Sequence, residues 1–599
     1  MRCLQSISRR RWSHYRFQPI DIESSDDAWR PLDRAVARWC VAHGGSQQLA
    51  RCAAQCSAAE AEGHTSVQLS AADAAAIIDE ALVGPGERTS AFVLDASGRF
   101  QFWRNYDAER DAALAIAGRC SGDSGAELAP MADVEQLFDM QHPERTSKQR
   151  KAVRQAPAHR LFVLTGGPGT GKTTTIVRML LQMLKQSGGN RSIRVAAPTG
   201  KAAQRLVQAM NRGLRDLRAS LDSHWDAAFA AMPKPEALTL HRLLGYDPRR
   251  NRYTHDAEQP LSADIVVVDE ASMMDLAQAR SLFAAMKPSS TLILVGDPDQ
   301  LTSVAAGAVL MDIVDTLTAH YSPQIVGLTQ VFRAEQHLVP VNEAVRIGDP
   351  VAFAAAMGAD PDTLTWRVID TRPELDRVLR EWSRSLVNLL HTAGSARQHS
   401  PDSARGVLSA VAGIQLLCAL RETPFGALAA HRTLEAMVRR GLQVDGDATW
   451  FPGRLVMVTR NDYANQLFNG DVGIALHDEA GELLVWFEAV DDDGEVSARG
   501  FAPNTLPDHE GAYAITIHKS QGSEYRQVAL LLPPDADHRV LSRQLLYTGV
   551  SRARRCLSIW GTKAVVDAAL MRPVERQGGF AQRLRMDLLR HAPTGLPSL

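Results

Sequence analysis

The central and C-terminal parts of the chain alternate short apolar runs with longer segments in which apolar residues recur at helical spacing. Continuous apolar runs of this length are typical of strands that are buried on both faces of a parallel sheet. The pattern therefore predicts an α/β fold in which strands and helices follow one another. The predicted strands are Leu161–Leu164, Ser192–Ala197, Asp264–Asp269, Thr291–Gly296, Gly413–Ala419, Gly453–Arg460, Val528–Pro533 and Cys556–Gly561.

Residues 1–140 have a different pattern and contain no catalytic motif. Alanine-rich stretches predict helices, and two apolar segments around a Ser-Gly turn predict a small hairpin. We interpret this region as a mostly helical interaction or scaffolding domain. The predicted helices lie at Asp33–Val41, Leu49–Glu62 and Ser70–Leu82, and the hairpin joins Ala91–Asp95 to Phe100–Trp103.

Three other stretches interrupt the α/β pattern. Residues 210–237 are expected to form a polar connection, and the last thirty residues a basic helical tail. After Asn469-Gly470, short strand-like pieces follow at Val472–Leu476, Leu483–Phe487 and Glu495–Phe501, separated by Glu479–Gly481 and Asp491–Gly494. Short strands with such turns predict a small β-barrel inserted in the second half of the chain.

Composition places few limits on function. The chain has 599 residues and a net charge of −2, so any nucleic-acid contact must come from local basic patches. No apolar run reaches the roughly 18 residues of a membrane span, and the Arg-rich first twenty residues lack a secretory signal core. The seven cysteines are scattered, which suits a reducing compartment, and we expect a cytoplasmic protein. Cys52 and Cys56 are interpreted as buried thiols rather than metal ligands.

The most specific motif follows the first apolar run. It reads Gly166-Gly167-Pro168-Gly169-Thr170-Gly171-Lys172-Thr173-Thr174, and a helical pattern begins directly after it. A strand, a glycine-rich loop and a helix in this order form a phosphate-binding loop. Backbone N–H groups and the helix N-terminus favour phosphate, Lys172 adds charge on the β- and γ-phosphates, and the Thr173 hydroxyl is a Mg²⁺ ligand. The sequence therefore predicts that the chain binds ATP with Mg²⁺.

Polar residues at the ends of two later strands fit hydrolysis of that ATP. Asp269 is suited to hold Mg²⁺, and Glu270 to accept the proton of the attacking water. Gln300, after the strand at Thr291–Gly296, could contact the γ-phosphate. Upstream of the loop, Gln149 could bond the edge of an adenine, although its position alone also fits a solvated helix face.

Two arginines from the second half of the chain are candidate arginine fingers. Arg333 ends the segment Val326–Arg333, and Arg552 lies in Leu545–Arg555. An arginine delivered onto the γ-phosphate from a second domain would couple ATP to domain closure. An ordinary surface arginine is the alternative for Arg333.

Taken together, the motifs resemble superfamily 1 DNA helicases and, within them, the RecD family, the alpha subunit of exodeoxyribonuclease V. The resemblance runs from Gln149 to Arg555. A weaker resemblance in the N-terminal domain rests on Arg30–Asp33 and Gly63–Ser70. The motifs that carry the main resemblance are Gly166–Thr174, Ala197–Ala203, Thr239–Gly245, Val268–Met273, Gly296–Leu301, Thr516–Glu524 and Tyr547–Ala553.

The resemblance implies a fold and an activity. It implies two RecA-like motor domains with parallel sheets at 141–322 and 323–599, an N-terminal subunit-interaction domain at 1–140, and a small SH3-like β-barrel at about 455–510. It implies a 5′→3′ single-strand DNA translocase that assembles with RecB-like beta and RecC-like gamma subunits into a helicase–nuclease for double-strand breaks.

The motifs also imply roles for individual residues. Gln149 would read the adenine, and Gln300, Arg333 and Arg552 would sense the γ-phosphate. A final set lies in motifs that face DNA in the family: Thr199, His241, Thr516 and His518.

Three other interpretations are considered. The chain could be a stand-alone helicase of the same motor class, although its short N-terminal region favours a subunit. It could be a binding module that uses nucleotide only as a switch, but the complete acid pair and the two candidate fingers argue against this. Nuclease chemistry could lie on this chain, but outside the ATP motifs we find no compact cluster of acids with a lysine.

Overall fold

The computed structural model describes residues 29–87, 89–121, 125–139, 142–320, 322–332, 335–394, 398–444, 448–490 and 496–591. The chain forms two compact units. The first ends at Asp107 and also contains Gln577–Gly579, and the second runs from Ala108 to Arg576 and resumes at Phe580. None of the helices in the described ranges combines the length and the apolar character that a membrane span requires.

In the described part of the first unit, helices α2, α3 and α4 accompany a small sheet. Its sheet has the order β1-β4-β3-β2, and the predicted hairpin is confirmed as the antiparallel pair β3–β4. Cys40, Cys52 and Cys56 lie in its apolar core, where burial raises the pKa of the Cys56 thiol to about 12. The elements are α2 (Pro31–Ala42), α3 (Gln47–Ala61), β1 (Val67–Gln68), α4 (Ala71–Ile77), β2 (Val83–Gly84), β3 (Phe92–Leu94) and β4 (Arg99–Phe102).

Two segments of this unit that carried the weaker resemblance have structural roles. Arg30 caps α2 by bonding the carboxylate of Asp33, which is 1% exposed and also accepts from the Ser57 hydroxyl. Thr65 donates its backbone N–H to the Gln577 carbonyl at 2.9 Å, so a residue near the C-terminus belongs to this unit.

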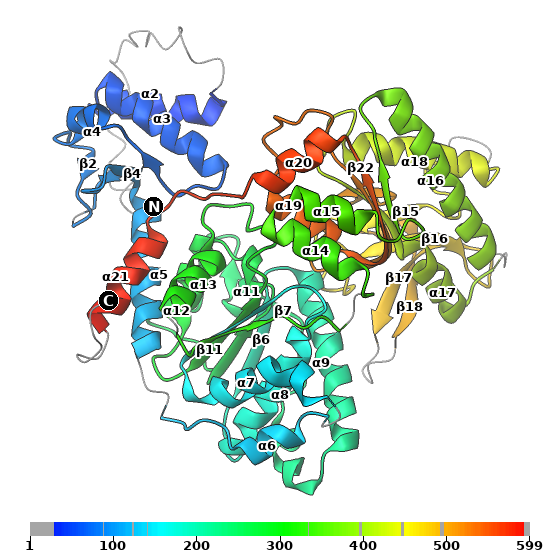
Figure 1. Cartoon of the computed structure of the whole chain (residues 1–599), viewed down its shortest axis with the longest axis horizontal. Helices are drawn as coiled ribbons and strands as arrows, with labels where there is room; N and C mark the ends of the chain where they lie inside the picture. The colour runs from blue at the N-terminus through cyan, green and yellow to red at the C-terminus, as the bar shows by residue number, and fades with distance from the viewer. Residues whose placement is uncertain are drawn as a thin grey trace. The chain divides into compact units, whose positions relative to one another are not determined.

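The second unit contains two parallel sheets (Figure 1). The first has six strands in the order β12-β5-β11-β10-β6-β7, and every neighbouring pair is parallel. We call it, with its helices, motor domain 1. Its strands are β5 (Leu161–Gly166), β6 (Ile193–Ala197), β7 (Leu238–Thr239), β10 (Ile265–Val268), β11 (Thr291–Gly296) and β12 (Ile325–Leu328).

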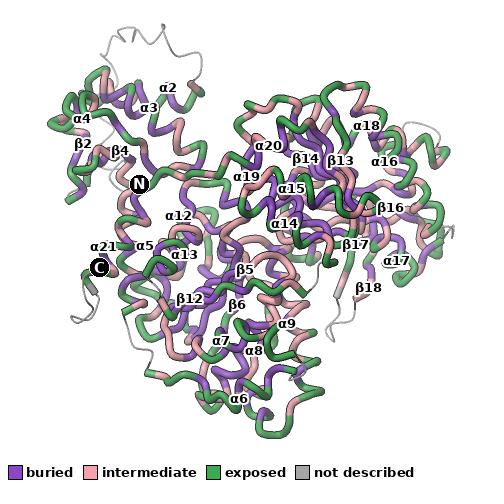
Figure 2. The backbone as a smooth tube through the Cα atoms, viewed as in Figure 1, coloured by how far each residue is buried: buried purple, intermediate pink, exposed green. Residues whose placement is uncertain are grey.

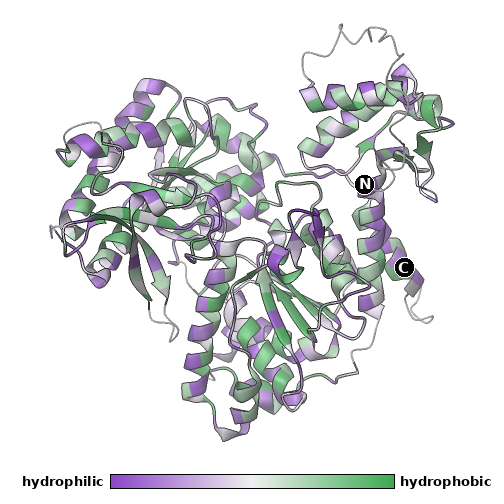
Figure 3. Ribbon diagram, turned by 180° about the vertical axis from the view of Figure 1, so that it is seen from behind, coloured by the Kyte–Doolittle hydropathy of each residue, from purple (hydrophilic) through white to green (hydrophobic). Residues whose placement is uncertain are grey.

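Both faces of this sheet are covered, which explains the continuous apolar runs. In β5, Leu161 and Val163 face one apolar cluster, whereas Phe162 and Leu164 face another. The first cluster includes residues of α12 (Leu276–Ala285) and α13 (Val309–Ala319), and the second includes residues of α7 (Ser147–Gln155), α8 (Lys172–Gln186) and α9 (Gly200–Ser220). Figure 2 shows the strands buried between these helix layers, and Figure 3 shows their apolar character.

The second sheet has five parallel strands in the order β13-β22-β21-β14-β20. With its helices we call it motor domain 2. Its strands are β13 (Leu364–Arg367), β14 (Ile414–Cys418), β20 (Ala514–Thr516), β21 (Tyr525–Leu531) and β22 (Ala553–Trp560), and its helices are α14 (Leu338–Ile347), α15 (Pro350–Met357), α16 (Arg372–Ala393), α17 (Pro401–Ala412), α18 (Ala427–Gly441), α19 (Arg543–Val550) and α20 (Lys563–Met571).

An antiparallel sheet lies where the inserted barrel is predicted. Its strand order is β18-β17-β16-β15-β19, and all five strands come between β14 and β20 in the sequence. Its closure as an SH3-like barrel stays a prediction. The strands are β15 (Leu455–Val458), β16 (Val472–His477), β17 (Leu483–Val490), β18 (Val496–Phe501) and β19 (His509–Gly511).

Two stretches differ from the sequence predictions. The predicted polar connection 210–237 is partly helical, because α9 extends to Ser220 and places Met210 and Leu217 in the core beside α8. The predicted basic tail is helical, and its helix α21 (Phe580–His591) also contributes side chains to an apolar core. Phe580 and Leu584 lie in the same apolar cluster as Ile313 of α13.

Candidate nucleotide site

The glycine-rich loop connects the carboxyl end of β5 to the N-terminus of α8. Gly171 precedes the helix with a φ of +84°, a left-handed conformation that favours glycine. A Cβ at Gly171 would lie 2.5 Å from the Gln149 amide nitrogen, so a side chain there would force the Gln149 amide to move. The loop therefore has the backbone that a phosphate cradle requires.

The side chains predicted to contact phosphate and Mg²⁺ lie in the first turn of α8. The Lys172 Nζ donates to the carbonyl oxygens of Gly166 and Gly167 at 2.7 and 3.1 Å. Thr173 and Thr174 follow in the first turn and are half-buried. The ammonium group is thus held over the loop itself, within reach of any anion that the loop N–H groups bind.

Gln149 contacts the loop from the other side. Its Nε2 donates to the Thr170 carbonyl at 3.0 Å, and the residue is 7% exposed. The backbone N–H of Phe332 donates to the Gly169 carbonyl at 2.9 Å. The structure therefore excludes a fully solvated helix face for Gln149, and its adenine role stays a prediction.

The acid pair Asp269–Glu270 follows β10, the strand beside β11. Asp269 is 8% exposed, and burial together with Glu270 raises its pKa to about 7, against the opposing effect of Lys172. Its Oδ1 accepts the Glu270 backbone N–H at 2.9 Å. Glu270 has a φ of +52°, which is uncommon for a non-glycine residue and costs on the order of 1 kcal/mol.

The loop after β11 carries Gln300 and two further acids. The Gln300 Nε2 donates to the Asp297 carboxylate at 2.9 Å, and both residues are almost fully buried. Burial raises the pKa of Asp297, and burial with the Asp297 charge raises the pKa of Asp299 to about 6. Gln300 is thus bonded to its own loop rather than directed into open space.

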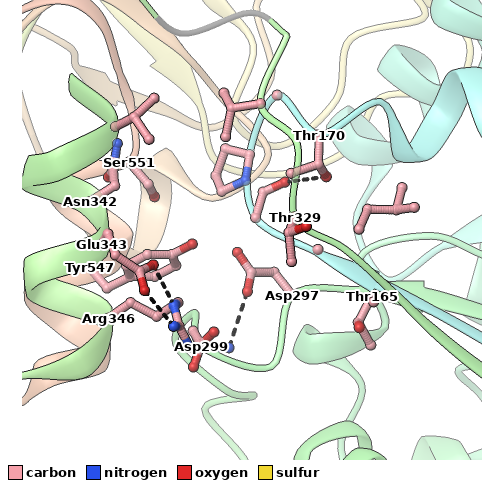
Figure 4. Close-up of a pocket in the computed structure, with 18 of the residues that line it drawn as sticks. Thr165, Thr170, Asp297, Asp299, Thr329, Asn342, Glu343, Arg346, Tyr547 and Ser551 are labelled. Carbon is pink, nitrogen blue, oxygen red and sulfur yellow. Dashed lines mark hydrogen bonds and ion pairs between the residues drawn. The ribbon is translucent and has the colours of Figure 1, made fainter. Parts of the chain in front are cut away.

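A cavity of about 520 Å³ lies between the glycine-rich loop and motor domain 2. Figure 4 shows side chains from both motor domains converging on it. Motor domain 1 contributes Thr165, Gly166, Gly167, Pro168, Gly169, Thr170, Asp297, Pro298, Asp299, Gly327 and Leu328, and the rest of the lining comes from Thr329, Val331, Val339, Asn342, Glu343, Arg346, Glu524, Tyr547, Ser551, Ala553 and Arg554.

Sequence reasoning missed the contribution of α14 to this cavity. Arg346 makes a bidentate ion pair with Glu343, with distances of 2.7 Å from Nε and 2.6 Å from Nη2, and this pairing raises the pKa of the guanidinium. Figure 4 shows the pair close to Asp299. No motif marks Arg346, and only its helical spacing from Asn342 and Glu343 could have indicated a shared face.

Of the two candidate arginine fingers, the structure describes only Arg552. Arg333 lies outside the described residues. Arg552 is 3% exposed, and its guanidinium donates to the Thr548 and Ser523 carbonyls at 3.0 and 3.1 Å. Those partners belong to motor domain 2, so in this conformation Arg552 lies behind the cavity wall formed by Ser551 and Ala553.

Comparison with known proteins identifies the family. A model of an AAA domain matches residues 149–306, and a UvrD-like helicase C-terminal domain matches residues 511–559. The RecBCD enzyme subunit RecD of Mycobacterium tuberculosis is 36% identical over 462 residues, which cover 76% of each chain. The chain belongs to the RecD family.

Other relatives agree. RecD of Haemophilus influenzae is 31% identical over 76% of this chain and 75% of its own length. The ATP-dependent RecD2 DNA helicase of Deinococcus radiodurans is 32% identical, over 74% of this chain but 52% of that protein. Among solved structures, Bacteroides Pif1 bound to ssDNA aligns with 70% of this chain and 93% of its own at 18% identity, with a TM-score of 0.36.

In this RecD family member, the four candidate DNA-facing residues lie at strand ends and helix starts. Thr199 caps α9 by accepting the Ala202 N–H at 3.3 Å, and Thr516 ends β20 and accepts the Lys519 N–H at 3.4 Å. His241 packs against Tyr246 and Tyr253, with ring centroids 5.3 and 6.0 Å away. Burial and the Arg576 charge lower the pKa of His518.

Contacts between the motor domains join the segments that carry these residues. The Lys201 Nζ donates to the Gly470 carbonyl, and an Arg205 Nη donates to the Gly522 carbonyl. Each bond joins α9 of motor domain 1 to a segment that follows β14 in the chain. The segments with Thr199 and Thr516 are thereby linked, although no bond joins the two residues themselves.

Proposed function

We propose that this RecD family member is an ATP-dependent DNA helicase, the motor subunit of a helicase–nuclease that processes double-strand breaks. The observation that carries the proposal is a cavity with the phosphate-binding loop of one α/β domain on one side and arginine-bearing elements of a second α/β domain on the other. Such a cavity changes shape when the domains move. Nucleotide bound there favours one arrangement of the domains by its difference in affinity for the two.

The geometry of motor domain 1 supports the proposed nucleotide roles. The N–H groups of Gly166–Gly171 and the α8 N-terminus would hold the phosphates, and Lys172 would exchange its carbonyl partners for phosphate oxygens. A hydroxyl on Thr173 and a buried carboxylate on Asp269 form an oxygen donor set that suits Mg²⁺. When bound, that ion would neutralise charge on the β- and γ-phosphates. Gln149 would lie against the adenine.

The hydrolysis roles need movement of side chains that are bonded elsewhere in this conformation. Glu270 would accept a proton from the attacking water. Gln300 and Arg552 would reach the γ-phosphate by leaving Asp297 and the Thr548 carbonyl, respectively. Arg333 is proposed as the second finger on the motif alone. Charge-assisted bonds from these groups would draw the two domains together, and hydrolysis would release them.

The remaining proposals rest on the family. DNA would lie across both motor domains, near Thr199, His241, Thr516 and His518, held by phosphate contacts and stacking. Translocation would run 5′→3′, with RecB-like and RecC-like subunits as partners and the N-terminal domain at 1–140 as the docking region. The motor domains are proposed at 141–322 and 323–599, except that β12 and α21 pack with motor domain 1. An SH3-like barrel at about 455–510 and a cytoplasmic location are also proposed.

The first experiment uses the purified chain with Lys172→Gln as its control. It measures ATP turnover with and without single-stranded DNA, and then unwinding of partial duplexes with a 5′ or a 3′ tail. DNA-stimulated turnover with 5′-tail unwinding supports the motor and its polarity. Turnover that Lys172→Gln retains would refute the site.

A folded chain without turnover calls for a second stage. Adding the beta and gamma subunits then separates two cases. ATP turnover that appears only in the complex supports a motor that depends on its partners. A complex that still shows no ATP turnover favours the nucleotide switch.

A further inference from the structure

The loop after β11 is held by side chains of motor domain 2. The backbone N–H of Leu301 donates to the Thr548 hydroxyl oxygen at 2.8 Å, and the Gln521 Nε2 donates to the Leu301 carbonyl at 3.0 Å. Both polar backbone groups of one residue are thus bonded across the domain boundary. Leu301 is 8% exposed, Thr548 is fully buried and Gln521 is half-buried, so water does not readily replace the bond to Thr548.

These two side chains come from segments with different candidate roles. Thr548 lies in α19, and its own carbonyl accepts from Arg552 Nε at 3.0 Å. Gln521 follows the 3₁₀ turn His518–Ser520, in the segment that also carries Thr516. The Leu301 backbone therefore connects the helix before a candidate arginine finger with the segment proposed to face DNA.

Leu301 is also the residue after Gln300. The Gln300 side chain is bonded to Asp297, and Tyr547 of motor domain 2 faces the same carboxylate across the cavity (Figure 4). Fixing the N–H and the carbonyl of Leu301 limits rotation of the backbone on the C-terminal side of Gln300. A movement of Thr548 or Gln521 would change where the Gln300 amide points.

We propose that Thr548 and Gln521 are positioning residues that couple DNA at motor domain 2 to Gln300 at the nucleotide site, acting through the Leu301 backbone. The proposal rests on the proposed function, because it assumes that the chain binds both ATP and DNA. DNA that displaces the Thr516–Gln521 segment would shift the Leu301 carbonyl, and nucleotide that draws Gln300 from Asp297 would shift the same loop in return. Thermodynamic linkage requires that the two effects be equal in binding free energy.

The test measures coupling through binding, so it does not depend on hydrolysis. The affinity of the full chain for a fluorescent oligo-dT strand is measured without nucleotide and with a non-hydrolysable ATP analogue. Coupling free energies between sites typically change an affinity 5- to 150-fold. We expect a change in this range for the unaltered chain, and less than about 2-fold for Thr548→Val and for Gln521→Leu.

Matched variants separate positioning from general damage. Thr548→Ser keeps the hydroxyl acceptor and should restore the coupling. Thr365→Val removes a similar hydroxyl, which donates to Ser558 at 2.7 Å inside motor domain 2, and should leave the coupling intact. The double variant Thr548→Val/Gln521→Leu should lose no more coupling than either single variant, because both act on one loop residue.

The outcomes are distinct. Coupling that is lost in both single variants and restored by Thr548→Ser supports the proposal. Coupling that survives in the two single variants, an equal loss in Thr365→Val, or an unaltered chain that binds both ligands without coupling would overturn it. A folded chain that binds neither the analogue nor DNA would instead refute the proposed function.

Discussion

Glu270 illustrates how single residues in the nucleotide site depend on their backbone. Its left-handed φ of +52° directs the chain away from β10, and its N–H bonds the Asp269 carboxylate beside it. Two adjacent acids at the end of a buried strand therefore have separate environments. Asp269 is buried beside the sheet, whereas Glu270 is only half-buried and can meet solvent.

This difference leads to a prediction for Glu270→Gln. The change keeps the size of the side chain but removes its ability to accept a proton from water. We expect DNA-stimulated ATP turnover to fall by about 100-fold or more, the usual effect of losing a general base. Binding of a fluorescent ATP analogue should remain within a few-fold. Glu479→Gln, at an exposed turn, is the control; comparable turnover in both variants would rule out the assigned role.

At the scale of elements, the start of α9 is fitted closely to the segment between β15 and β16. A Cβ at Gly200 would lie 2.7 Å from Cδ1 of Phe468, so only glycine allows this approach. The same segment holds Gly470, whose carbonyl bonds Lys201. Burial lowers the pKa of this lysine to about 7. The start of α9 in motor domain 1 is therefore in close contact with the segment between β15 and β16.

We predict that Gly200→Ala destabilises the protein by about 1–3 kcal/mol, the usual cost of overpacking. Gly406→Ala is a matched control, because it is also a helical glycine but a Cβ there meets no atom within 4 Å. That control should stabilise the protein by up to about 1 kcal/mol through helix propensity. Urea unfolding measures both. A Gly200→Ala protein as stable as the Gly406→Ala protein would contradict the packing.

A second element-scale prediction concerns α13 and pH. Asp312 is half-buried near Glu109 and Asp315, and partial burial with these two charges raises its pKa from 3.8 to about 7. The folded state therefore binds a proton more tightly than the unfolded state, so stability falls as the pH rises from about 4 to about 7. Asp312→Asn should remove this dependence of stability on pH.

Urea unfolding between pH 5 and pH 8 checks that prediction. The variant should gain stability relative to the unaltered protein as the pH rises, by an amount on the order of 1 kcal/mol. Asp315→Asn is the comparison, because Asp315 is less buried and should show a smaller gain. A difference between Asp312→Asn and the unaltered protein that stays constant with pH would exclude a raised pKa.

At the scale of the whole molecule, the C-terminal helix contributes to a core formed far earlier in the chain. Leu584 of α21 is fully buried in the same cluster as Ile313 of motor domain 1. Motor domain 1 therefore does not end where its last strand ends. Its stability depends on residues that are made after motor domain 2 is complete.

We predict that Leu584→Ala destabilises motor domain 1 by about 2–5 kcal/mol, the cost of a cavity in a core. Leu589→Ala changes the same residue type on the same helix, but Leu589 is 62% exposed and should change stability by less than about 0.5 kcal/mol. Thermal unfolding, with bound ATP analogue reporting on motor domain 1, compares the two. Equal effects would show that α21 does not complete this core.

The sequence by itself determined the features that depend on local order along the chain. Glycines, a lysine and a hydroxyl must follow a strand directly to make a phosphate loop, so Gly166–Thr174 is readable without a fold. Buried parallel strands need continuous apolar runs, so the strands that precede Asp269 and Gln300 are also readable. Glycine and Asn turns marked the place of the antiparallel sheet.

Only the tertiary structure decided which distant residues meet. Arg346, Tyr547 and Thr548 reach the nucleotide cavity or its loop because α14 and α19 pack where the second sheet faces the first. Residues 210–220 are helical because Met210 and Leu217 find partners on α8, and α21 is part of a core because motor domain 1 leaves an apolar face for it. Such contacts arise from packing between segments hundreds of residues apart, and no local pattern records them.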